Sequence, residues 1–194
     1  MSDIASLVKH LQGFLPLSEE ELDELAQRTH LRKIKRRQFL LQEGEICRHY
    51  TFVEQGCLKL YYIDVNGYEH NLQFAAENEW LADIGSFHTE KPSRLYMEAV
   101  EPSIVLQLEK KDLILFYTDY PKFNRIFRVM AEDSLVELQN RLLQNFSSTA
   151  AERYRSFLNK YPHLINRLPN TQIASYIGIT PEFLSRIRKE LSSK

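Results

Sequence analysis

Regularly spaced turns constrain the fold of this chain more than any other feature of its sequence. Only six of the 194 residues are glycine, and Gly44, Gly56 and Gly67 follow one another at intervals of 12 and 11 residues. Glycine reaches backbone conformations that other residues avoid, so it is common at tight turns. The segments between these glycines favour strands, and Asn66-Gly67 is a typical hairpin turn. The pattern predicts an antiparallel meander folded as a sandwich, roll or barrel, with strands at 38–41, 50–54, 57–63, 69–74, 95–100 and 104–108.

Three helices are expected around these strands. Ser18 and Glu21 have the spacing of a capping box, which opens a short helix at 22–29. A second short helix is expected at 110–117, and residues 122–146 form a long helical pattern without glycine or proline. At the usual rise per residue the long helix would span about 37 Å, more than a small domain needs.

The long helix carries apolar residues on two faces instead of one stripe. This pattern favours burial against the strands on one side and against a second copy of the chain on the other. We therefore expect a dimer helix, with an interface formed by Phe127, Met130, Leu138 and Leu142. The alternative is a core helix of a monomer.

Charge is distributed unevenly along the chain. The formal net charge is −1, from 25 basic and 26 acidic residues. Residues 148–194 contain eight basic and three acidic residues, so this segment carries +5 and the remainder −6. A basic end on an acidic body suggests a nucleic-acid partner, although surface charge is often segregated without one.

Several protein classes are disfavoured by the sequence. No apolar run approaches the roughly 18 residues of a membrane span, and residues 1–13 do not resemble a signal peptide. Cys47 and Cys57 match no metal or redox spacing, and the six histidines form no metal-binding pair. No catalytic motif stands out, and Trp80 is expected in the core. We expect a soluble, cytoplasmic protein that is not an enzyme and has no metal or cofactor.

Residues 170–189 form the most specific motif, which reads as helix, turn, helix. Ala174 is small enough for a close helix crossing, and Gly178 suits the positive φ of the turn. Thr180 can cap the second helix, Pro181 suits its first turn, and Glu182 favours the positive end of its dipole. The apolar positions between the helices are Ile173, Ile177, Ile179, Leu184 and Ile187. A plain helical hairpin in a core is the alternative.

The second helix of this motif has a polar outer face. Glu182, Ser185, Arg186 and Lys189 lie at i, i+3, i+4 and i+7, so they project together. An arginine can bind guanine with two hydrogen bonds, and a glutamate can accept one from cytosine. Arg188 and Lys189 are better placed for phosphates. A solvated charged face would look similar.

The order of β roll, long helix and helix-turn-helix resembles the Crp/Fnr family of bacterial transcription regulators over nearly the whole chain. Gly44-Glu45 followed by Tyr50, Gly56 and Gly67 resembles the family's cyclic-nucleotide-binding roll. The run from Glu182 to Arg186 matches the family's E-x-x-S-R pattern, whose Glu, Ser and Arg read bases. The resemblance implies DNA contacts by Thr171, Gln172, Thr180, Glu182, Ser185, Arg186, Arg188 and Lys189.

The resemblance implies an α+β fold in three parts. An antiparallel, jelly-roll-like β-roll sensor domain is expected at 1–118, the dimerisation helix at 119–147 and the helix-turn-helix domain at 148–194. The last domain would be of winged-helix type with its wing shortened or absent, because the sequence stops at Lys194. Without a wing, DNA binding should depend more on the second helix and on Arg153, Arg155 and Arg167.

The effector cassette departs from the family pattern. In the family a Gly-Glu pair and an Arg-Ser pair hold the ribose hydroxyl and the cyclic phosphate. The effector-pocket residues expected here are Ala82, Asp83, Gly85, Ser86, Ser93 and Arg94, so that the Arg-Ser order is reversed. Asp83 is one methylene shorter than glutamate, and Arg94 can instead pair with a surface acid. Cyclic AMP is therefore not the expected effector.

The sequence thus predicts a homodimeric, sequence-specific DNA-binding transcription regulator that acts on a palindromic operator. Its expected partners are double-stranded DNA, RNA polymerase and an unidentified small-molecule effector, with no membrane. The alternative is a small-molecule- or protein-binding β-roll module without effective DNA binding.

Overall fold

The computed structural model describes residues 4–192, so the first three and last two residues of the expected end domains lie outside the described part. The chain forms two compact units. We call residues 1–62 with 73–131 unit 1, and residues 63–72 with 132–194 unit 2. This division differs from the linear one expected, because the long helix contributes to both units and a hairpin from the strand region groups with the C-terminal helices.

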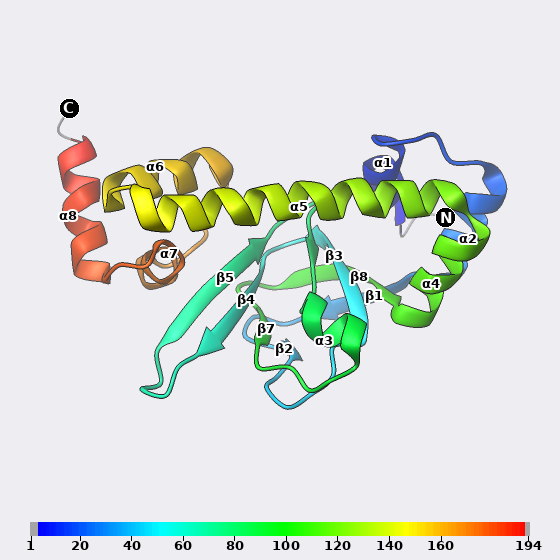
Figure 1. The fold of residues 1–194 in the computed structure, drawn as a ribbon, viewed down its shortest axis with the longest axis horizontal. Coiled ribbons are helices and arrows are strands. Elements are labelled where there is room, and N and C mark those ends of the chain that lie inside the picture. The colour runs from blue at the N-terminus through cyan, green and yellow to red at the C-terminus, as the bar shows by residue number, and fades with distance from the viewer. Residues whose placement is uncertain (1–3, 193–194) are drawn as a thin grey trace. The chain divides into compact units, whose positions relative to one another are not determined.

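Two four-stranded antiparallel sheets confirm the expected β roll (Figure 1). The strand order is β1-β8-β3-β6 in one sheet and β2-β7-β4-β5 in the other, so neighbours in space are often distant in sequence. The connectivity is therefore that of a roll and not of a simple meander. The strands are β1 (His30–Ile34), β2 (Phe39–Leu41), β3 (His49–Gln55), β4 (Leu58–Ile63), β5 (Glu69–Ala75), β6 (Trp80–Leu81), β7 (Tyr96–Ala99) and β8 (Ser103–Glu109).

The first five helices of the chain include all three that were expected. They are α1 (Ala5–Gln12), α2 (Glu19–Arg28), α3 (Ile84–Thr89), α4 (Lys110–Asp119) and α5 (Pro121–Ser147). The capping box of α2 is present: the Ser18 backbone N–H donates to the Glu21 carboxylate at 2.6 Å, and the Glu21 N–H donates to the Ser18 hydroxyl at 3.3 Å. No helix within residues 4–192 is long and apolar enough to span a membrane.

The turn glycines have the positive φ that was expected of them. Gly56 has a φ of 99°, and a Cβ placed there would lie 2.8 Å from the Ser103 Cα. Only glycine therefore fits between β3 and β4 without moving the backbone at the start of β8.

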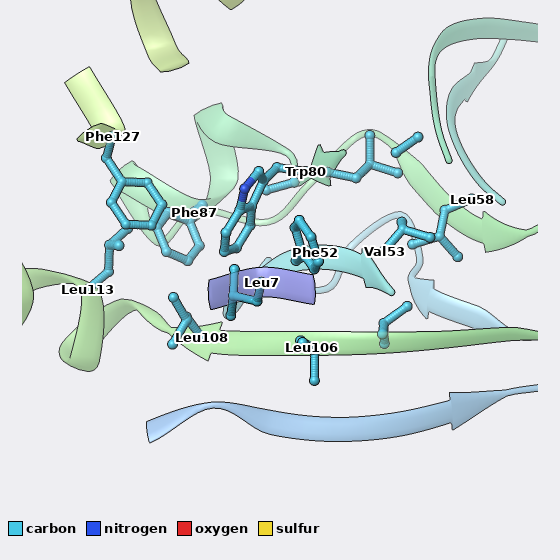
Figure 2. Packing of buried hydrophobic residues seen from close by; sticks show 14 of the residues in the cluster. Leu7, Phe52, Val53, Leu58, Trp80, Phe87, Leu106, Leu108, Leu113 and Phe127 are labelled. Atoms are coloured by element: carbon cyan, nitrogen blue, oxygen red, sulfur yellow. The ribbon is translucent and has the colours of Figure 1, made fainter. Parts of the chain in front are cut away.

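The core of unit 1 contains residues of both sheets and of the helices α1, α4 and α5 (Figure 2). Phe52 of β3 lies beside Trp80, at 5.2 Å between ring centroids, and Phe127 of α5 lies 5.5 Å from Trp80. Leu7 of α1 belongs to the same cluster. Trp80 is thus a core residue as expected, and both cysteines are buried.

Unit 2 has its own small core. Its helices are α6 (Ala150–Lys160), α7 (Asn170–Ile177) and α8 (Pro181–Ser192), together with residues 132–147 of α5. Tyr176 of α7 packs edge-on against Phe157 of α6 at 5.5 Å and against Tyr161 at 5.9 Å. Each of these three side chains is at least nine-tenths buried.

Candidate nucleic-acid interface and effector cassette

The turn between α7 and α8 has the geometry that the sequence predicted. Gly178 ends α7 in the left-handed region, with φ 71° and ψ 44°, and the Ile179 N–H donates to the Ala174 carbonyl at 3.0 Å. Nothing lies within 4 Å of a Cβ at Gly178, so its backbone conformation alone favours glycine. The Thr180 hydroxyl then accepts from the Phe183 N–H at 3.3 Å, and Pro181 begins α8.

The two helices pack through the apolar residues that were expected between them. Ile173, Ala174 and Leu184 are fully buried. Ile177 and Ile187 are also buried, whereas Ile179 is half-buried. Because this packing holds the apolar side of α8 against α7, it fixes the orientation of the opposite side of α8.

The outer side of α8 is exposed and polar. Glu182, Ser185, Arg186 and Lys189 are all exposed. The Arg186 guanidinium lies 5.1 Å from the centre of the Phe183 ring, and the Ser185 hydroxyl donates to the Pro181 carbonyl at 3.1 Å. Hydrogen bonds from its own backbone N–H and from the Thr180 hydroxyl lower the pKa of Glu182, so this carboxylate is ionised at neutral pH. The face therefore offers both a guanidinium donor and a carboxylate acceptor.

Within unit 2, residues 69–71 of the hairpin contact α7. The Asn71 amide nitrogen Nδ2 donates to the Gln172 carbonyl at 3.2 Å, and the Asn71 backbone N–H donates to the Ser175 hydroxyl at 2.9 Å. Ser175 in turn donates to the Glu69 carbonyl at 2.6 Å. The side-chain oxygens of Asn71 and Gln172 are buried without a hydrogen-bond partner in the described part of the chain. The Gln172 amide oxygen is thus buried, whereas Thr171 is exposed.

Two basic side chains that were expected at DNA are engaged within unit 2. Arg188 is half-buried and donates to the Asn170 side-chain oxygen. Arg153 donates to the Ile177 carbonyl at 2.9 Å and to the Ser148 carbonyl at 2.8 Å. Arg153 therefore satisfies carbonyls at the end of α7 and just after the end of α5, because the C-terminal ends of helices leave carbonyls without intrahelical partners.

The residues expected at the dimer interface divide into two pairs. Phe127 is 5% exposed in the core of unit 1, and Met130 is half-buried against that core. Leu138 and Leu142 lie in the unit 2 part of α5 and are 52% and 48% exposed. Phe127 thus has little surface left for a second copy. Further exposed apolar side chains accompany Leu138 and Leu142 and were not expected there: Leu135, Val136, Leu143 and Phe146.

The cassette forms a turn whose polar groups bond to one another. Asp83 caps α3 by accepting from the Ser86 N–H at 3.1 Å, and its second oxygen accepts from the Ser93 hydroxyl at 2.6 Å. The Ser86 hydroxyl donates to the Lys91 carbonyl and accepts from the Cys47 N–H.

The other cassette residues have different surroundings. Arg94 is exposed, with its guanidinium 5.6 Å from the centre of the Tyr62 ring. Ala82 is buried in the core cluster, and Gly85 lies in α3. The structure therefore brings Asp83, Ser86 and Ser93 together but leaves Arg94 apart from them.

Comparison with known proteins gives one family match. Residues 31–120 match the cyclic nucleotide-binding domain family. A search of curated proteins finds no match.

Solved structures share the fold over most of the chain. FixK2 from Bradyrhizobium japonicum aligns with a TM-score of 0.75 at 18% identity, covering 85% of each chain. The c-di-GMP-responsive global regulator CLP from Xanthomonas campestris aligns at 0.71 and 15% identity, covering 89% of this chain and 90% of CLP. A protein from Eubacterium rectale described as a regulator of the Crp/Fnr family aligns at 0.71 and 13% identity, covering 93% of this chain and 88% of that one. Residues 31–120 are therefore similar to a cyclic nucleotide-binding domain, and the chain has the fold of Crp/Fnr family regulators over most of its length.

Proposed function

We propose that this protein is a homodimeric, sequence-specific transcription regulator that places α8 in the major groove of an operator. The observation that carries the proposal is the α7–turn–α8 motif, in which buried residues fix α8 while Glu182, Ser185 and Arg186 stay exposed. An exposed arginine and carboxylate on one helix face can distinguish base pairs in that groove. Arg188 donates to Asn170, and the Gln172 side-chain oxygen is buried. Base reading therefore rests on Glu182, Ser185 and Arg186, and exposed Lys189 supplies phosphate contact.

The proposed function needs a dimer, because the α8 helix of one copy reads only one half-site of a palindromic operator. The apolar row from Leu135 to Phe146 on α5 is exposed over about three turns, an unusual length for a helix in water. A second copy of α5 packed against this row would bury it and pair two α8 helices. Two related copies recognise a palindrome whose half-sites lie roughly one turn of DNA apart.

The β roll serves as the sensing part in this proposal, with a small-molecule effector other than cyclic AMP. Cyclic AMP would need a cation and unoccupied hydrogen-bonding groups at the cassette. Both Asp83 oxygens already accept hydrogen bonds, and Arg94 lies over Tyr62. The regulator would act in the cytoplasm, on DNA and RNA polymerase, without chemistry of its own.

Selection from random double-stranded DNA with the full chain tests the proposal. We expect repeated rounds to enrich a palindromic sequence, and we expect Arg186→Ala to lose the preference at one base pair in each half-site. The matched control is Arg36→Ala, which removes an exposed arginine of unit 1. Failure to enrich any sequence would favour the alternative of a binding module without effective DNA affinity.

A further inference from the structure

A cavity lies in unit 1 next to the cassette, whose Ser86 hydroxyl accepts a hydrogen bond from the N–H of Cys47 in the cavity lining. It has a volume of about 480 Å³ and is lined by residues of both sheets and of the 44–49 segment, with none from 82–94. Its volume lies in the range of small-molecule pockets. Its apolar wall comes from Leu40, Ile46 and Met97. We call it the basic cavity, for the charges described below.

The floor of the basic cavity is polar, although it belongs to the interior of a β roll. Thr51 of β3 and Gln107 of β8 are directly opposite in the sheet and are 1% and 2% exposed. The Gln107 amide nitrogen donates to the Thr51 hydroxyl at 3.0 Å, and the Gln107 oxygen accepts from Arg32 Nη1 at 3.0 Å. Because a guanidinium has five N–H donors, this bond orients Arg32 and leaves it donors for another partner.

Positive charge converges at the mouth of the basic cavity. Arg32 and Arg48 both line it, and neither forms an ion pair within residues 4–192. The lining has a single carboxylate, that of Glu45, which accepts from the Gln42 N–H at 2.8 Å. Two guanidinium groups thus face one carboxylate.

The neighbouring His49 is affected by the same charges. Burial lowers the pKa of His49; Glu109 opposes the change, while Arg32, His30 and Arg48 add to it. His49 is therefore neutral at pH 7, and its ring can donate or accept a hydrogen bond without adding charge.

We propose that the basic cavity binds a small organic carboxylate. The guanidinium groups of Arg32 and Arg48 hold the carboxylate, since a planar fork matches two oxygens, and the apolar wall contacts the rest of the molecule. A singly charged head fits because the lining has one cation in excess. A dianion such as phosphate would bring its second charge to Glu45 and would leave the apolar wall in contact with water. This binding does not depend on DNA recognition.

Calorimetry on the full chain with benzoate, benzamide and inorganic phosphate tests the chemistry of the ligand. Benzamide has the shape of benzoate without its charge. We expect benzoate to bind at millimolar concentration or below, at least about tenfold tighter than benzamide or phosphate, because a charge-assisted hydrogen bond is lost in benzamide. Equal binding of phosphate, or no binding of benzoate at millimolar concentration, would overturn the proposal.

Site variants then locate the binding. Arg48→Gln and Arg32→Gln should each weaken benzoate binding about tenfold or more. The control is Lys33→Gln, because Lys33 is the next residue of β1, is exposed and does not line the cavity. In NMR spectra benzoate should shift the side-chain amide signals of Gln107. Arg48 makes no hydrogen bond among the described residues, so its variant should fold even if Arg32→Gln does not. Benzoate binding that persists in Arg48→Gln, or leaves the Gln107 signals unmoved, shows that the ligand binds elsewhere and refutes the assignment.

Discussion

Unit 2 and the cassette of unit 1 use similar residue types in opposite ways. On α8 the Arg186 guanidinium is exposed with only a ring beside it, and on α5 a row of leucines faces outward. In the cassette, Asp83, Ser86 and Ser93 are tied to one another and to backbone groups. A surface that binds a partner leaves its groups available, whereas a structural turn satisfies them itself. Five experiments test this difference.

The largest effect is expected on α5. Leu138→Asp would place a charge where a second copy should pack, at a cost of several kcal/mol in dimerisation free energy. Sedimentation should then show a monomer, and operator binding should fall with it. Because Leu138 is 52% exposed, each unit should stay folded. A variant that remains dimeric with both units folded would place the interface elsewhere.

The second effect concerns base reading by α8. Arg186→Ala should cost roughly 1–3 kcal/mol of binding free energy on the preferred operator and relax one position in each half-site. Affinities for the preferred operator and for operators changed at single base pairs measure this. An equal loss on every sequence would show that Arg186 contacts phosphate instead of a base.

The third effect concerns the contribution of the cassette to the stability of the fold. Asp83→Ala removes the cap of α3 and the acceptor of the Ser93 hydroxyl, so the free energy of unfolding should fall by about 1 kcal/mol. Asp83→Asn is the matched control, because asparagine keeps a capping oxygen. Denaturant unfolding compares the two variants, and an unchanged stability in Asp83→Ala would mean that the turn does not depend on this side chain.

A smaller, sequence-independent effect is expected from Lys189. Lys189→Ala should weaken binding to all sequences alike and reduce the slope of log affinity against log salt by about one. Titrations at several salt concentrations measure the slope. A change in base preference would instead assign Lys189 to recognition of bases.

The last prediction is that cyclic AMP does not bind. Cyclic AMP should give no binding heat in calorimetry, because the Asp83 oxygens are occupied and Arg94 lies over Tyr62. Micromolar binding that disappears in Arg94→Ala would show that the reversed Ser93-Arg94 pair still holds the phosphate.

The sequence predicted the elements whose signals are local. The turn of the helix-turn-helix depends on Gly178 and Thr180, both within a 20-residue motif, and the structure has both as expected. The α6 helix was not predicted, although Thr149 and Glu152 form a capping box that could have indicated it. β1 was missed for a different reason: only Ile34 of its five residues is buried, so it lacks the alternation that marks a strand.

Partners distant in sequence could not be predicted. A helical pattern shows that Phe127 has an apolar neighbour but not whether that neighbour is Trp80 or a second copy of the chain. Likewise, nothing near Gln172 indicates that Asn71, 101 residues away, binds its carbonyl. The expected DNA contacts of Gln172 and Arg188 followed from the family resemblance and from position on a helix, whereas the surroundings of both side chains depend on tertiary packing.

The hairpin at 63–72 has a consequence for dissecting the molecule. These residues lie between β4 and β5 in the chain but belong to unit 2, so neither unit is one uninterrupted stretch of sequence. A fragment that starts at residue 132 would give up the Asn71 contacts and expose the Ser175 hydroxyl and the Gln172 carbonyl to water. A chimera that exchanges the C-terminal helices with those of a relative must therefore carry the relative's matching hairpin with them. If the chimera is joined in the long helix alone, the hairpin of this protein would have to pack against an α7 helix of different sequence.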